Sequence, residues 1–411
     1  MATDRMYELA FRYKKTKLWK QLCDTDIFAV RLSDGEIGYC CVMGMAGKEN
    51  AVALYPGDQA FQSYRELLGL TLKRMRPPEI GFQDLFLSQN CLQCAFETKD
   101  LLQPDEVDEV RVYAKKHGIT LRGANAFPQF VKYQPCYHPW YISSEQEQRY
   151  ICEALEACIA MAELVEKQGR KAFRFLNRIA SVSSFSDILC LEKENGCYIV
   201  TRVPFPAEIP AEYPSPVMKN EVALARLKKM KKKGSLECRL VRLPMPVQES
   251  EDMPPYYPAL LAVVDTKAKK IYPTQPVLYL EEQPEDCLDT FVEVLLKAGI
   301  CPKAIHTDDP RTFELLKHLC NGVEIRLTLT DDELPELDEA IDGLMSAMLP
   351  EPEDTAEVMS EVFDMIMSLS DGELKQLPGE MITEMLELAE AGLIPPEVEF
   401  KLRRALMCIR N

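Results

Sequence analysis

Hydrophobic and polar positions follow two periods along this chain, one typical of strands and one typical of helices. Three short apolar runs predict an antiparallel meander, over residues 27–32, 37–42 and 51–54. Asp34–Gly35 stands at the first turn of that meander, a dipeptide that tight hairpins favour. Apolar residues at helical spacing predict three helices, over residues 6–22, 104–117 and 144–168. Ser144 and Glu147 form a capping box at the start of the last helix.

Further along, Asn195–Gly196 between two apolar runs predicts a second hairpin, over residues 188–203. Residues 127–141 are aromatic and punctuated by proline, and we expect little regular structure there. These elements predict an α+β domain over residues 1–243, with a sub-boundary near 170–187. The proline-rich stretch 244–257 is expected to be a linker.

Residues 258–349 predict a second, α/β domain with the element order β-β-β-α-β-α-β-α. The apolar run 260–264 ends at Asp265 as a buried strand would, and 277–280 is expected to be another strand. Gly299 ends the first helix, and Asp309 before Pro310 begins the second. The third and last part, residues 354–411, carries short amphipathic stretches rich in Met and Glu, which predict an all-α region.

The element order of 258–348 resembles the ribonuclease H-like fold, a mixed sheet with right-handed crossovers. Acidic residues fall where members of that fold place metal ligands. Asp265 ends the first expected strand, and Asp308 and Asp309 follow the fourth. The last helix carries four more carboxylates: Glu336, Asp338, Glu339 and Asp342. The resemblance implies two-metal phosphodiester chemistry, with Asp265, Asp308 or Asp309, and Glu339 as catalytic residues and Mg²⁺ ligands.

Each of these residues also has a structural explanation. Asp265 precedes a turn, where aspartate commonly accepts a hydrogen bond from its own backbone. Asp309 is explained as a helix cap, and the acidic residues of the last helix are typical of a solvated face. Cys91-Leu92-Gln93-Cys94 is a single CxxC without a second pair, so packed thiols are favoured over zinc or redox chemistry.

Charge is unevenly distributed along the chain. The net charge is −17, and residues 281–411 hold 31 Asp and Glu against 10 Lys and Arg. An acidic region repels nucleic acid and attracts basic surfaces, so a protein partner is favoured and nucleic acid is not. The lysine-rich helix end at 226–233 suits the helix dipole, and it is also the best patch in the chain for nucleic acid or an acidic partner.

The composition favours a cytoplasmic protein. No apolar run approaches the ~20 residues that span a bilayer, and the N-terminal stretch lacks the pattern of a secretory signal. Fifteen scattered cysteines without such a signal are typical of reduced thiols. Four histidines and no visible pair of nucleophile and base make a hydrolase hard to build.

Two sets of motifs indicate a family. YELAFRYKKTKLWKQL, EIGYCCVMG, ALYPGDQAFQSYRELL and FPQFVKYQPCYHPWY resemble an uncharacterised bacterial protein family. LLAVVD and CPKAIHTDDPRTFELL resemble a second domain of unknown function that accompanies the first. The resemblance implies no activity, substrate or cofactor. We therefore expect a non-enzymatic interaction or regulatory protein without a cofactor, the alternative being a Mg²⁺-dependent phosphodiester hydrolase or transferase.

Overall fold

The computed structural model describes residues 2–45, 50–73, 87–123, 125–173, 175, 186–272 and 274–348, with Val398, Lys401 and Arg403. The chain divides into two units, Met1–Asp342 and Gly343–Asn411. The predicted helical region 354–411 lies outside the described residues except for the last three named, which are helical.

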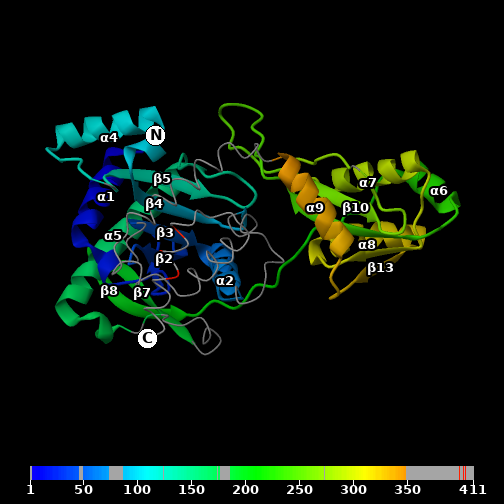
Figure 1. Ribbon diagram of the computed structural model, residues 1–411. Coiled ribbons are helices and arrows are strands. Elements are labelled where there is room, and N and C mark those ends of the chain that lie inside the picture. The colour runs from blue at the N-terminus through cyan, green and yellow to red at the C-terminus, as the bar shows by residue number, and fades with distance from the viewer. Residues whose placement is uncertain are drawn as a thin grey trace. The chain divides into compact units, whose positions relative to one another are not determined.

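The first sheet of the described chain has eight strands in the order β6-β5-β4-β3-β2-β1-β7-β8 (Figure 1). The strands are β1 Phe28–Arg31, β2 Ile37–Met43, β3 Asn50–Pro56, β4 Cys91–Glu97, β5 Phe127–Tyr133, β6 Trp140–Tyr141, β7 Asp187–Glu194 and β8 Cys197–Pro204. The predicted meander is confirmed as β1-β2-β3, and the Asn195–Gly196 hairpin as β7-β8. β7 pairs in parallel with β1, so this hairpin extends the same sheet.

Helices cover both faces of the first sheet. They are α1 Asp4–Thr16, α2 Gly57–Lys73, α4 Pro104–Lys116 and α5 Glu145–Gln168, with short 3-10 turns η1 Leu18–Lys20, η2 Lys99–Leu101 and η3 Arg170–Ala172. Side chains of α1, α4 and α5 form one core with the sheet, and Phe61 and Tyr64 of α2 belong to the core on the other face. The capping box of Ser144 and Glu147 is confirmed.

Two sequence predictions for this part differ from the structure. The helix expected over 6–22 stops at Thr16, because Lys17 adopts the left-handed conformation with φ of 53°. Residues 127–141, expected to have little regular structure, contain β5 and β6. Pro128 is tolerated in β5 although proline cannot donate to a ladder, and β5 pairs with β4 along its whole length.

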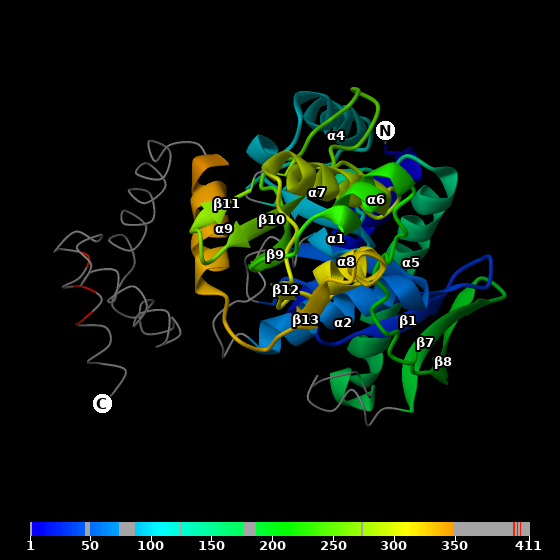
Figure 2. The ribbon, with the colours of Figure 1, turned by 90° about the vertical axis from the view of Figure 1, so that its right-hand side faces the viewer.

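The second sheet of the described chain has five strands in the order β11-β10-β9-β12-β13 (Figure 2). They are β9 Ser235–Arg242, β10 Ala259–Asp265, β11 Lys270–Ile271, β12 Ala304–Thr307 and β13 Arg326–Leu329. β9, β10 and β11 are antiparallel neighbours, whereas β12 and β13 run parallel to β9. The helices are α6 Glu221–Lys229, α7 Pro284–Ala298, α8 Pro310–Val323 and α9 Pro335–Met348.

The predicted mixed sheet and its order β-β-β-α-β-α-β-α are confirmed, but the first strand is β9. The strand at 260–264 is the second, and the third is the short β11. Residues 277–280 form no strand; Val277 makes one isolated bridge to Ala259. The expected linker 244–257 connects the antiparallel pair β9 and β10, so the boundary expected there falls inside this sheet.

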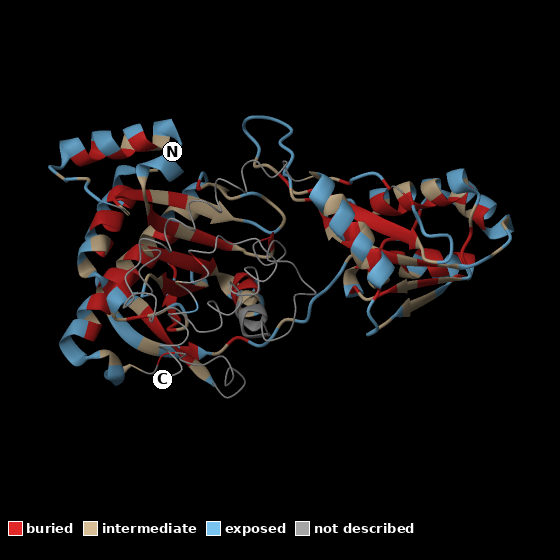
Figure 3. Cartoon of the chain, viewed as in Figure 1, coloured by how far each residue is buried: buried red, intermediate tan, exposed pale blue. Residues whose placement is uncertain are grey.

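The two faces of the second sheet differ. Leu227 of α6, Leu288 of α7 and Leu316 of α8 share a core with Leu236 and Cys238 of β9. α9 contributes Leu337 and Ile341, both buried, toward the other face, while its remaining positions are largely exposed (Figure 3). In the part of the chain that the structure describes, no helix is both long and apolar enough to cross a membrane.

Candidate functional site

The candidate site lies on the face of β9 that points away from the hydrophobic core. Alternate residues of a strand point to opposite faces, and Leu236, Cys238 and Leu240 are buried in the core. Glu237 and Arg239 therefore project from the opposite face, where α9 lies. This places two charged side chains in the middle of the central strand.

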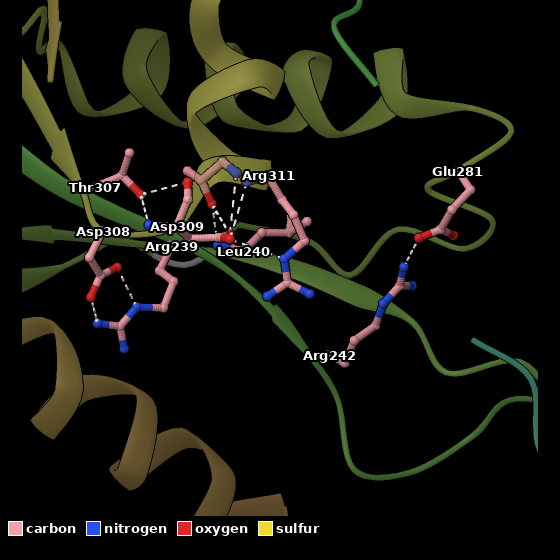
Figure 4. Close-up of polar contacts among 9 residues, drawn as sticks. Arg239, Leu240, Arg242, Glu281, Thr307, Asp308, Asp309 and Arg311 are labelled. Carbon is pink, nitrogen blue, oxygen red and sulfur yellow. Dashed lines mark hydrogen bonds and ion pairs between the residues drawn. The ribbon is translucent and has the colours of Figure 1, made fainter. Parts of the chain in front are cut away.

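Arg239 is held by two aspartates from different elements. Its Nε donates to Oδ1 of Asp308 at 2.8 Å, and its Nη2 forms a second bond to the same carboxylate (Figure 4). Its Nη1 donates to Oδ1 of Asp338 on α9 at 2.6 Å. Burial by itself lowers the pKa of Arg239, but the bonds to Asp308 and Asp338 outweigh it and raise that pKa. The guanidinium is thus the fixed counter-ion of both carboxylates.

Glu237, Arg239, Asp308 and Asp338 form a charged cluster. Glu237 is the member with a carboxylate oxygen that accepts no hydrogen bond from a described residue. Its Oε2 is buried and has no hydrogen-bond partner among the described residues. Burial raises the pKa of Glu237, and the nearby carboxylates of Glu336, Asp338 and Asp308 raise it further, whereas Arg239 lowers it. Arg239 is thus the one cation beside Asp308, Asp338 and Glu237 among the described residues, and the cluster keeps a negative balance.

Asp308 reaches the site because of the turn that joins β12 to α8. β12 ends at Thr307, and Asp309 caps α8 by accepting hydrogen bonds from the backbone N–H groups of Arg311 and Thr312, both at 3.2 Å. The Thr312 hydroxyl also donates to Asp309 at 2.7 Å. Asp309 is buried and caps α8, as expected from its position before Pro310, and its Oδ1 also accepts a hydrogen bond from Nε of Arg311 at 3.0 Å.

Asp265 lies toward the opposite end of the sheet from Asp308. β10 is antiparallel to β9, and its register places Asp265 level with Leu236. β12 is parallel to β9, and its register places Asp308 level with Arg239. The two aspartates are thus separated by about 10 Å along β9 and about 9.6 Å across it, or roughly 14 Å between Cα atoms. Asp265 instead accepts a hydrogen bond from the N–H of Ala268 at 2.8 Å, within the turn to β11.

Glu339 points away from the site. Residues of an α-helix advance by about 100°, so Glu339 lies about 200° around α9 from the buried Leu337. Glu336, Glu339 and Asp342 are exposed, and only Asp338 faces Arg239. The structure therefore brings together Asp308 and Asp338 from the predicted residues, but not Asp265, Asp309 or Glu339.

The arrangement does not fit a magnesium site. Mg²⁺ requires oxygen ligands in nearly octahedral geometry, and a two-metal site needs carboxylates shared between ions ~3.5–4 Å apart. Across the described residues, no group of three or more His, Cys, Asp or Glu side chains is placed to hold a metal ion. The space between Asp308 and Asp338 is taken by the guanidinium of Arg239.

Glu237 and Arg239 were missed from the sequence because residues 1–243 were assigned to the first domain, ahead of the expected linker 244–257. The signal was present: in SLECRLVR, charged residues alternate with apolar ones in the middle of a strand. Cys91 and Cys94 are buried on opposite faces of β4, as packed thiols rather than a paired site. Burial raises the pKa of Cys91 to about 12, so this thiol is not activated.

No curated protein matches the chain. One solved structure is similar, the "HTLV-2 integrase catalytic core domain in complex with magnesium (trimeric form)", with 13% sequence identity and a TM-score of 0.20. The similarity covers 43% of this chain and 83% of that one. Two family models match: residues 4–178 fit a domain of unknown function, DUF7309, and residues 223–345 fit another, DUF6930. The chain thus combines these two domains of unknown function.

Proposed function

We propose that this chain is a non-catalytic interaction protein whose second sheet serves as a scaffold. The observation that carries the proposal is the position of Arg239 between Asp308 and Asp338. Carboxylates that already have a cation within hydrogen-bond distance have no need of a metal ion to relieve their repulsion. The charged cluster then stabilises the packing of α9 on the sheet and performs no reaction.

The partner that we propose is a protein, and the compartment is the cytoplasm. The fourteen cysteines among the described residues are free thiols, in keeping with a reducing environment. The acidic balance of residues 281–411 opposes contact of that part with nucleic acid.

A metal titration tests the proposal. The melting temperature of the full chain is measured with millimolar Mg²⁺ or Mn²⁺, for the wild type and for Asp308→Asn, Glu237→Gln and Asp265→Asn. We expect no metal-dependent rise in any of the four proteins. A rise in the wild type that disappears in Asp308→Asn and Glu237→Gln, yet persists in Asp265→Asn, would refute the non-catalytic role.

A Mg²⁺-dependent phosphodiester hydrolase or transferase is the second candidate. One observation favours it: the buried Oε2 of Glu237 has no hydrogen-bond partner among the described residues and lies near other carboxylates. This candidate requires Arg239 to leave the cluster. Cleavage of labelled RNA or DNA that depends on both Mg²⁺ and Asp308 would establish it.

A further inference from the structure

The edge of the second sheet opposite to Asp308 carries a row of cations. β9, β12 and β13 are parallel, so their starts share one edge, and the turn between β10 and β11 lies at the same edge. Six of the exposed cations at this edge are referred to as the basic row: Lys231, Lys233, Lys267, Lys269, Lys303 and Arg326.

Backbone hydrogen bonds fix the segments of the basic row next to one another. The N–H of Lys233 donates to the carbonyl of Cys301 at 2.8 Å, and the N–H of Lys303 donates to that of Gly234 at 2.9 Å. The N–H of Arg326 donates to the carbonyl of Lys303 at 3.0 Å. The row therefore arises from the register of the strands, and it runs across five strands, about 19 Å at ~4.8 Å per strand.

The basic row lacks counter-ions within the described part of the chain. None of the six forms an ion pair with a described residue, whereas the neighbouring Lys232 pairs with Glu324 at 3.1 Å. Three helices, α6, α7 and α8, end at this edge, and each helix C-terminus contributes roughly −0.5 charge. The basic row, Lys232 and Lys270 make eight cations at this edge. Against them stand the carboxylates of Asp265 and Glu324 and the three helix dipoles, which leaves about +4.5.

We propose that the basic row binds an extended acidic segment of a protein partner. An extended chain rises ~3.3 Å per residue, so about six residues span the row and present a side chain near each strand start. Ile271 of β11 is 56% exposed and offers an apolar contact next to the cations. This inference deepens the proposed interaction role but uses other residues than Arg239.

The surroundings favour a short acidic peptide over nucleic acid. The opposite edge of the same sheet carries exposed Asp331, Asp332 and Glu333 just after β13, which would repel a long polyanion passing over the domain. Tyr272, the aromatic residue just after β11, is buried, so its ring is not open to stack on bases.

Fluorescence anisotropy on the full chain tests the inference. The probes are a labelled peptide of eight glutamates and a labelled oligonucleotide of eight thymidines, each at low and at physiological ionic strength. The key variant is Lys233→Gln/Lys303→Gln/Arg326→Gln. The matched control, Lys20→Gln/Lys115→Gln/Lys167→Gln, makes the same change of net charge at exposed sites of the first domain.

We expect the peptide to bind at low ionic strength, with a dissociation constant raised about tenfold in the key variant and unchanged in the control. The proposal is overturned by absence of peptide binding, by an equal loss in the control, or by tighter binding of the oligonucleotide through the same three residues. Since the metal titration does not involve the basic row, the two proposals can fail separately.

Discussion

Replacing Arg239 with glutamine removes the counter-ion of Asp308 and Asp338 while keeping a side chain of similar length. The Arg239 side chain is 19% exposed, Asp308 28% and Asp338 47%. Breaking a buried ion pair costs about 3–5 kcal/mol, whereas an exposed pair contributes about 0.2–1 kcal/mol. These partly exposed contacts fall between the two limits, so Arg239→Gln is expected to lower the free energy of unfolding by about 2 kcal/mol.

Urea unfolding of the full chain, followed by far-UV circular dichroism, measures this loss. Both tryptophans, Trp19 and Trp140, lie in the first domain, so their fluorescence reports that domain separately. The double mutant with Asp308→Asn completes a thermodynamic cycle, for which we expect a coupling energy of about 1.5 kcal/mol. Lys297→Gln is the control: its pair with Glu293 is exposed, and its loss is expected to cost less than about 0.5 kcal/mol.

Additive effects of Arg239→Gln and Asp308→Asn, within about 0.4 kcal/mol, would contradict the reasoning. They would mean that the two side chains act independently and that the guanidinium does not hold the carboxylate. A loss in Arg239→Gln no larger than in the Lys297→Gln control would contradict it equally.

Further predictions concern four single substitutions. Asp309→Ala should cost about 1–2 kcal/mol by uncapping α8, whereas Asp265→Ala should cost less than about 1 kcal/mol, both by urea unfolding. Tyr13→Phe should be neutral or stabilising by up to about 1 kcal/mol, because the buried Tyr13 hydroxyl has no partner among the described residues; fluorescence of the neighbouring Trp19 would reveal a destabilised variant instead. Glu237→Gln should be more stable than the wild type at pH 7, because the raised pKa of Glu237 makes its ionised form unfavourable in the folded state. That difference should vanish below the ordinary glutamate pKa of about 4.3, and a difference that persists at pH 3 would contradict it.

The order of helices and strands in the second domain was largely predictable from the sequence, but the pairing of its first strands was not. Apolar periodicity in 258–348 identified α7, β12, α8 and α9, because these elements alternate at short spacing. It could not tell that SLECRLVR pairs with ALLAVVD across a proline-rich connection, since strand pairing over such a distance leaves no local signal. The predicted order of elements was therefore right, but the strand at 260–264, expected as the first of the domain, is the second.

This difference in strand order explains why the predicted site residues Asp265 and Asp308 lie apart. With Asp265 on the first strand, its carboxylate would lie at the same sheet edge as Asp308. Because Asp265 belongs to the antiparallel β10, it lies toward the other edge. Caps and turns were better predicted, because Asp309 before Pro310 and Ser144 three residues before Glu147 depend only on neighbours in sequence.

We infer that Arg239, and not a metal ion, balances the carboxylates of Asp308 and Asp338. Electron paramagnetic resonance of free Mn²⁺ in equilibrium with the full chain counts bound ions directly. We predict no difference in bound Mn²⁺ between the wild type and Asp308→Asn at submillimolar metal. One or two ions per chain in the wild type, lost in Asp308→Asn and retained in Asp265→Asn, would contradict the claim.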